Sequence, residues 1–272
     1  MLPIALQLYS IRDDMSKDCK GSLQKVKKMG YDGVEFAGLY EYSPADMKAM
    51  LSEIGLTPVS AHVSYDVLMA DPDGVLNTYK EVGCQYVVIP YMTEEYRIGA
   101  EKGQKALEGI RSLAEAASRH GLTMLYHNHD FEFLQVNGEY ALDIIFKTIP
   151  QAILKTEIDT CWVATAGVDV CAYLRKYTGR APLVHIKDYI IEEGGSAEGA
   201  YELIGIETNG EKKSAKFEYR PLGCGQQDFP AIIQASVDAG AEWLVVEQDM
   251  PSMGKTAMEC ADMGIRYLKS LR

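Results

Sequence analysis

Short apolar runs alternate with amphipathic segments along most of the chain. Runs of this length that are rich in Val, Ile, Leu and Tyr are typical of buried β-strands, and apolar residues spaced three and four apart between them are typical of helices. The clearest helical segment is 101–121, where Leu107, Ile110 and Leu113 share one face and Gly121 suits the helix end. The expected strands are 3–10, 31–36, 56–63, 84–90, 122–128, 153–159, 181–188 and 242–249.

The connections from helix to strand share one sequence pattern: a helix end, a glycine, then a strand, as in KKMGYDGVEF and SRHGLTMLYH. Such repeated strand–helix units favour parallel strands joined by helices. Eight units in 272 residues predict an α/β fold, with residues 1–272 forming a single (β/α)8 TIM barrel.

One long segment does not follow this alternation of strands and helices. Residues 189–219 are rich in glycine and charge and show no clean helical period. Loops of this length are usually functional or disordered. Because the segment follows the seventh strand, at the catalytic end of such a barrel, we expect an excursion that covers the substrate, and a small hairpin would fit this role.

The composition of the chain disfavours several classes of function. The formal net charge of −12 disfavours broad binding to nucleic acid. No apolar run approaches the length of about 20 residues that spans a bilayer, and the first residues lack a basic leader region. The six cysteines are scattered without a CxxC pair, which favours reduced thiols and a cytoplasmic location.

Three of the expected strands end in groups that can bind a metal ion: Asp159, His185 and Glu247. In a parallel barrel the strand ends meet at one mouth, where catalytic groups gather. Glu132 follows the fifth strand closely enough to fold back over that mouth. Three carboxylates and one imidazole suit Mn²⁺, Mg²⁺, Co²⁺ or Zn²⁺ with positions left open for a substrate. Glu157, two residues before Asp159, is a competing or supporting carboxylate.

The remaining polar residues at the strand ends suggest acid–base chemistry and substrate contacts. His127 and His129 share a face of the fifth strand, and Lys187 shares a face with His185, so we expect these side chains to point into the mouth. A lysine there can stabilise an oxyanion or move a proton. The expected contacts to substrate hydroxyl groups are Gln7, Tyr9, Glu35 and His62.

Several motifs resemble the xylose isomerase-like barrel superfamily, which includes sugar isomerases and epimerases, inosose dehydratases, 3-dehydroshikimate dehydratases and endonuclease IV. YHNHDFEF resembles the subset named sugar phosphate isomerase/epimerase, which also contains lyases of 3-keto-glycosides. The resemblance covers almost the whole chain. It is carried by YHNHDFEF (126–133), EIDTCWVATAG (157–167), VHIKD (184–188), RPLGCGQQDF (220–229) and VVEQD (245–249).

The resemblance implies that Asp159, His185 and Glu247 bind a divalent metal ion. Many relatives have a glutamate where this chain has His127, so the fourth ligand is either His127 or Glu132, and charge favours Glu132. Trp162 replaces the histidine of the DTCH motif, which disfavours the three-zinc DNA-repair branch and suits stacking on a sugar ring. Arg220, which opens its motif, joins the expected substrate contacts.

The expected reaction is proton abstraction alpha to the carbonyl of a keto-sugar or cyclic polyol, aided by the metal. His127 or a carboxylate such as Glu247 would be the base, and Lys187 or a histidine such as His129 would stabilise the enediolate. Reprotonation would give an isomerase or epimerase, whereas loss of a leaving group would give a dehydratase or lyase. Phosphodiester cleavage and non-catalytic carbohydrate binding are the rival functions. The expected partners are a small carbohydrate and, in a homo-oligomer, further copies of the chain.

Overall fold

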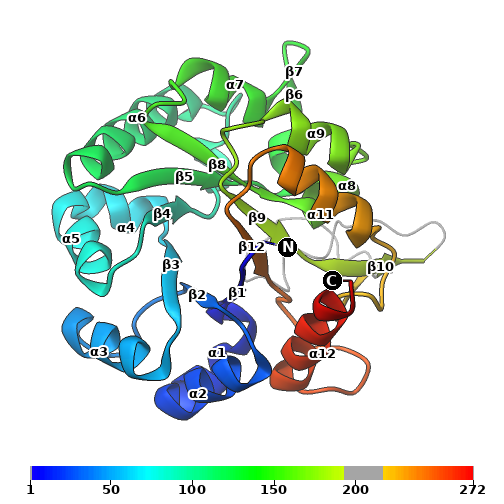
Figure 1. Ribbon diagram of the computed structural model, residues 1–272. Helices are drawn as coiled ribbons and strands as arrows, with labels where there is room; N and C mark the ends of the chain where they lie inside the picture. Colours follow the sequence, from blue (N-terminus) through cyan, green and yellow to red (C-terminus); the bar gives the residue numbers. More distant parts are fainter. Residues whose placement is uncertain (1, 193–216, 272) are drawn as a thin grey trace.

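The computed structural model describes residues 2–192 and 217–271, and its centre is a closed barrel of parallel strands surrounded by helices (Figure 1). The strands follow one another around the barrel in sequence order, and β12 closes it against β1. The predicted (β/α)8 TIM barrel is therefore confirmed. Its strands are β1 (Ile4–Gln7), β2 (Gly33–Phe36), β3 (Thr57–His62), β4 (Tyr86–Ile89), β5 (Thr123–His127), β8 (Leu154–Asp159), β9 (Leu183–Ile186) and β12 (Trp243–Val246).

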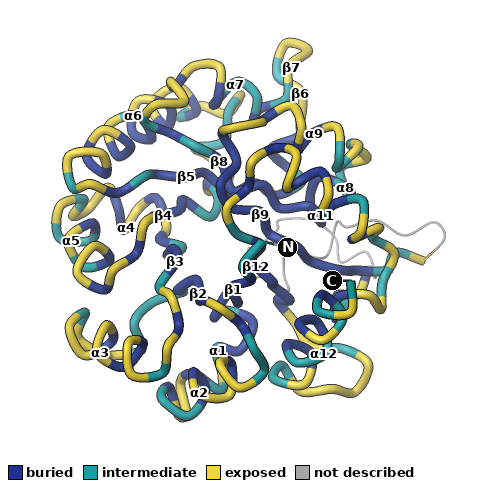
Figure 2. The backbone as a smooth tube through the Cα atoms, viewed as in Figure 1, coloured by how far each residue is buried: buried dark blue, intermediate teal, exposed yellow. Residues whose placement is uncertain are grey.

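Helices surround the barrel, and the strands and the sides of the helices that face them are largely buried (Figure 2). The side chains between them form the main hydrophobic core. The longest helix is α6 (Gly103–Arg119), which matches the helix expected over 101–121. The others are α1 (Arg12–Lys17), α2 (Cys19–Met29), α3 (Pro44–Ile54), α4 (Tyr65–Ala70), α5 (Pro72–Val82), α7 (Ala141–Thr148), α8 (Thr160–Thr165), α9 (Val170–Lys176), α11 (Phe229–Asp238) and α12 (Ala257–Ser270), with the 3-10 turns η1 (Leu8–Ile11), η2 (Glu94–Tyr96) and η3 (Asp130–Phe133).

The observed strands are shorter than the apolar runs that predicted them. The first run enters η1 after Gln7, whose side-chain oxygen accepts a hydrogen bond from the backbone N–H of Tyr9 (3.0 Å). Tyr9 therefore lies on a turn and not at the end of a strand. Lys187 and Glu247 likewise lie one residue beyond β9 and β12.

Alternating residues of each strand point into the barrel and form two layers. The lower layer is apolar, and the residues two positions further along several of the same strands are polar: Ala5 precedes Gln7, Leu125 precedes His127, and Val245 precedes Glu247 in this way. The polar groups therefore stand on a dry floor, where electrostatic interactions are stronger than in water. The apolar floor consists of Ala5, Val59, Tyr86, Val88, Leu125, Leu183 and Val245.

Two short hairpins extend the loops at the strand ends. β6 (Gln135–Val136) pairs with β7 (Glu139–Tyr140), and β10 (Asp188–Ile191) pairs antiparallel with β11 (Phe217–Arg220). The second hairpin joins the two ends of the excursion expected over 189–219; the rest of that expectation, residues 193–216, lies outside the described residues.

Candidate active site

Asp159 presents one fixed and one available carboxylate oxygen at the end of β8. Its Oδ1 accepts hydrogen bonds from the backbone N–H groups of Cys161 (2.8 Å) and Trp162 (3.1 Å), which caps α8. Its own backbone N–H donates to Asn128 Oδ1 (3.0 Å). Its Oδ2 is buried and accepts no hydrogen bond within the described part of the chain. The Lys187 ammonium lies 3.3 Å from this oxygen, and a buried carboxylate oxygen that makes no hydrogen bond fits a metal ligand.

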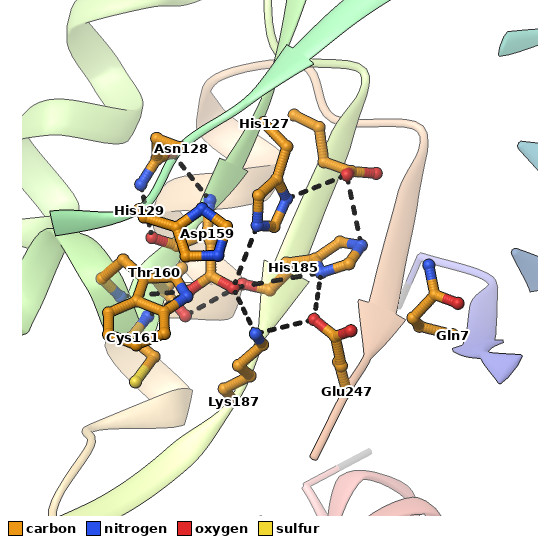
Figure 3. A network of polar contacts seen from close by, with 12 residues as sticks. Gln7, His127, Asn128, His129, Asp159, Thr160, Cys161, His185, Lys187 and Glu247 are labelled. Atoms are coloured by element: carbon orange, nitrogen blue, oxygen red, sulfur yellow. Dashed lines mark hydrogen bonds and ion pairs between the residues drawn. The ribbon is translucent and has the colours of Figure 1, made fainter. Parts of the chain in front are cut away.

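The side chains of His185, Lys187 and His127 converge on Asp159 (Figure 3). His185 Nδ1 lies 3.9 Å from Asp159 Oδ2 and 3.1 Å from Glu247 Oε2. Ligand atoms about 2.0–2.2 Å from one ion lie roughly 3–4 Å apart, so these three atoms can share a divalent cation. Two carboxylates with an imidazole suit the metals expected from the sequence.

His185 is held between carboxylates on both sides of its ring. Its Nε2 lies 2.6 Å from Glu35 Oε1, on the side of the ring opposite Glu247. Burial lowers the pKa of His185, but the charges of Glu157 and Glu35 outweigh this effect and raise the pKa well above its usual value. From the sequence we expected Glu35 to contact substrate, but the structure buries it fully against His185.

His127 is the second imidazole that a carboxylate orients. Its Nδ1 lies 3.0 Å from Glu157 Oε2, and its Nε2 lies 3.8 Å from Asp159 Oδ2. Burial, together with the neighbouring His185 and His62, lowers the pKa of His127 well below its usual value, which keeps the ring neutral. His127 can therefore accept a proton, or complete the metal site as a fourth ligand.

A second group of side chains has metal-binding potential: His62, His127, Glu157 and His185. Hydrogen bonds account for its contacts. His62 Nε2 and His127 Nδ1 both face Glu157 Oε2, at 2.6 and 3.0 Å. His185 Nε2 approaches Glu35 more closely (2.6 Å) than Glu157 (3.3 Å). One N–H from each histidine ring is enough to make these hydrogen bonds, so this group needs no cation. We therefore place the cation at the group of Asp159, His185 and Glu247.

Lys187 is a buried cation among three carboxylates. Its Nζ lies 2.7 Å from Glu247, 3.0 Å from Asp249 and 3.3 Å from Asp159. Burial lowers the pKa of Lys187, but these carboxylates raise it well above its usual value. Sequence reasoning missed Asp249, although it follows Glu247 by only two residues, just beyond the end of β12. Burial raises the pKa of Asp249 to about 6, against the opposing charge of Lys187.

Glu132 does not reach the metal position that we expected it to share. It lies in η3, where Oε2 accepts a hydrogen bond from the backbone N–H of His129 (2.7 Å). Its Oε1 accepts one from the Tyr126 hydroxyl (2.8 Å), and Tyr126 packs in the outer core around the barrel. Both oxygens are thus used away from the mouth. Burial raises the pKa of Glu132 to about 8, in spite of these hydrogen bonds.

Trp162 and Arg220 also lie outside the cavity that the sequence suggested for them. Trp162 is fully buried and packs between His129 (5.1 Å between ring centroids) and Phe217 of the β10–β11 hairpin (6.3 Å). Arg220 pairs with Glu218 (3.0 Å) on that hairpin. The tryptophan therefore supports the wall of the site from behind and has no surface on which a sugar ring could stack.

A cavity of about 360 Å³ opens above the polar layer, a volume that suits a small ligand. Most of the expected catalytic and contact residues reach it, including Gln7, Tyr9 and His62. Its lining consists of Gln7, Tyr9, Ala37, His62, Pro90, Tyr91, His127, His129, Lys187, Glu247 and Asp249.

We predict that Asp159→Asn lowers divalent-metal affinity by more than about 100-fold, the upper range for an outer-shell partner, and leaves the fold intact. The asparagine oxygen can still cap α8, so the free energy of unfolding should fall by no more than about 1–2 kcal/mol. Glu132→Gln is the matched control and should bind metal as the wild type does. Metal content after dialysis and urea unfolding measure both effects. Equal loss of metal in the two variants would return Glu132 to the ligand set.

Metal should also stabilise the folded chain, because the cation binds carboxylates that the unfolded chain does not bring together. At about 100 times the dissociation constant, we expect Mn²⁺ to raise the free energy of unfolding by about 2.7 kcal/mol. Urea titrations with Mn²⁺ and with a chelator measure the difference. Asp159→Asn should show little difference. An equal metal response in the variant and the wild type would place the stabilising ion elsewhere.

Among the described residues, no helix has the length and apolar character needed to cross a membrane.

The comparisons with known proteins agree with this fold. An inosose dehydratase of Clostridium perfringens is 24% identical over 181 residues, a match that covers 66% of this chain and 58% of that protein. The chain thus spans less than two thirds of this relative. A sugar phosphate isomerase/epimerase structure from Parabacteroides distasonis superposes with a TM-score of 0.76 at 21% identity and covers 99% of this chain and 94% of its own. The zinc-bound IolI structure has a TM-score of 0.75 at 16% identity, with 99% and 98% covered.

These structural likenesses concern the fold, and the sequence match decides the family. The family sequence profile covers residues 23–271, nearly the whole chain. The chain therefore belongs to the Xylose isomerase-like TIM barrel family.

Proposed function

We propose that this protein is a divalent-metal-dependent enzyme that removes the proton alpha to the carbonyl of a keto-sugar or cyclic polyol. The observation that carries the proposal is the group formed by Asp159 Oδ2, His185 Nδ1 and Glu247, in which the buried Oδ2 makes no hydrogen bond within the described residues and lies 3.3 Å from the Lys187 ammonium. A bound divalent cation would polarise the substrate carbonyl and acidify the neighbouring C–H bond. The zinc in the IolI structure supports a metal in a barrel of this kind.

His127 is the proposed base. When its Nδ1–H donates to Glu157 Oε2 (3.0 Å), its Nε2 carries the lone pair, and the ring lines the cavity. Glu247 is a weaker candidate: burial raises its pKa, but the charge of Lys187 and the hydrogen bond with His185 lower it well below the usual value. Its Oε2 also lies 2.7 Å from Lys187 Nζ and 3.1 Å from His185 Nδ1, and Glu247 belongs to the proposed metal group. His127, whose ring lines the cavity, is therefore the preferred acceptor.

Lys187 is the proposed electrostatic partner of the developing oxyanion. Its ammonium group reaches the cavity and is fixed by carboxylates on neighbouring segments, so it needs little reorganisation during the reaction. His129 lies beside His127 in the cavity wall, 5.3 Å between ring centroids. We propose that His129 returns a proton to the intermediate.

The proposed outcome is isomerisation or epimerisation, in which the enediolate is reprotonated at a neighbouring carbon or on the opposite face. Dehydration or another lyase outcome is the second candidate, and the inosose dehydratase match favours it. Both outcomes start with the same proton removal. A keto-sugar and an inosose are therefore suitable first substrates for the same assay.

We predict that His127→Ala slows exchange of the alpha proton with solvent by about 10²–10⁴-fold, since a positioned base contributes about that much. Lys187→Met should still bind substrate and exchange about 10²–10³-fold more slowly, because it lacks an oxyanion partner. Deuterium incorporation from D₂O in single turnovers, over a panel of keto-sugars and inososes with Mn²⁺, measures both variants. His120→Ala is the control, because it changes a histidine at the C-terminal end of α6.

The products separate the two outcomes. An isomerase or epimerase yields a deuterated isomer of unchanged composition, whereas a dehydratase yields a product that has lost one water. Wild-type exchange in His127→Ala would assign the base to a carboxylate. If the metal-loaded wild type exchanged no proton with any member of the panel, the proposed enolisation would be wrong and a non-catalytic carbohydrate-binding barrel would be favoured.

A further inference from the structure

We propose that Glu35 is a positioning residue that keeps a proton on Nε2 of His185 and thereby makes Nδ1 the atom that binds the metal. This inference rests on the metal position proposed above. It assigns to Glu35 a role in which the carboxylate touches neither substrate nor metal.

Glu35 is held as an acceptor from several directions. Its Oε1 lies 2.6 Å from His185 Nε2 and accepts a hydrogen bond from the Gln7 amide (2.7 Å). Its Oε2 accepts one from the Ser60 hydroxyl (2.5 Å). These donors lie on β9 and on β1 and β3, the two strands that flank β2, so three strands of the barrel fix the carboxylate. Glu35 and His185 are both fully buried, so water is not at hand to replace either partner.

The two nitrogens of His185 face different partners, and a neutral imidazole has one N–H and one lone pair. Nε2 faces Glu35, whereas Nδ1 lies 3.1 Å from Glu247 Oε2 and 3.9 Å from Asp159 Oδ2. A ring that kept its proton on Nδ1 would point an N–H at the cation. A carboxylate that accepts a hydrogen bond from Nε2–H disfavours this tautomer and makes Nδ1 a stronger ligand.

Glu35 is the best-placed acceptor for the proton on His185 Nε2. Glu157 Oε2 is also within 3.3 Å of His185 Nε2, but His62 and His127 already approach that oxygen at 2.6 and 3.0 Å. The His62 ring stacks on His185, with 5.2 Å between centroids and 9° between planes. This stacking opposes a turn of the His185 ring that would put carbon atoms where Nε2 and Nδ1 now face their partners.

The tautomer can be read directly in the Zn²⁺-loaded protein with ¹⁵N-labelled histidine. We expect the His185 ring to carry a single proton, on Nε2, in a hydrogen bond, and its Nδ1 to show the shift of a metal-bound nitrogen. His185→Gln identifies the signal by its loss. A proton on Nδ1, or Zn²⁺ bound through Nε2, would overturn the inference. The measurement needs no substrate. It can therefore contradict the role of Glu35 while the proposed enolisation stands, and it can support that role even if the proposed enolisation is wrong.

Two substitutions of Glu35 separate its hydrogen bond from its charge. Glu35→Leu removes the acceptor and should weaken Zn²⁺ binding by about 10–100-fold, the range for outer partners of metal ligands. Glu35→Gln removes the charge but keeps a carbonyl acceptor, so its loss should be clearly smaller, with the Nε2 proton retained. Zn²⁺ titration against a competing chelator measures the affinities.

Glu242→Leu is the control, since this carboxylate precedes β12 at the other end of the barrel and accepts a hydrogen bond from the Tyr86 hydroxyl (2.7 Å). It should bind Zn²⁺ as the wild type does. Wild-type affinity in Glu35→Leu, or equal losses in the leucine and glutamine variants, would contradict the proposal. If Glu35→Leu does not fold, the wild-type spectrum still decides the question.

Discussion

The burial of several carboxylates at one end of the barrel is the constraint on which the whole site depends. An ionised carboxylate in a protein interior costs several kcal/mol unless a cation or hydrogen-bond donors compensate it. Each one here is therefore matched: by imidazole N–H groups, by Lys187, by helix α8, or by the proposed metal ion. The carboxylates, each at most 5% exposed, are those of Glu35, Glu157, Asp159, Glu247 and Asp249.

Strand alternation made the centre of this arrangement predictable. The inward face of a strand repeats every second residue, so a polar residue at the end of an apolar run stands above the core. Neighbouring strands then bring such residues together, as the register of Asp159 with His185 shows. The order of strand–helix units gave the barrel for the same reason. The ends of the strands were less certain, because a hydrogen bond from the Tyr9 backbone N–H to the Gln7 side chain starts a turn inside an apolar run.

Contacts between distant segments decided the residues that the sequence misplaced. Glu132 was expected at the mouth on charge, but a 3-10 turn and the Tyr126 hydroxyl direct it outward. Trp162 was expected to contact the substrate, but the aromatic residues of the β10–β11 hairpin cover it. No pattern in the sequence near Trp162 predicts its contact with this distant hairpin. Glu35 differs again: its place at the barrel interior was predictable, whereas its bond to His185, 150 residues away, was not.

The most direct test of this account is the position of a metal ion in crystals that contain Mn²⁺, located by its anomalous scattering. The account predicts one strong peak about 2.0–2.3 Å from Asp159 Oδ2, His185 Nδ1 and a Glu247 oxygen. A peak bound by His62 and Glu157, or no peak at saturating Mn²⁺ in a site with ordered side chains, would contradict it.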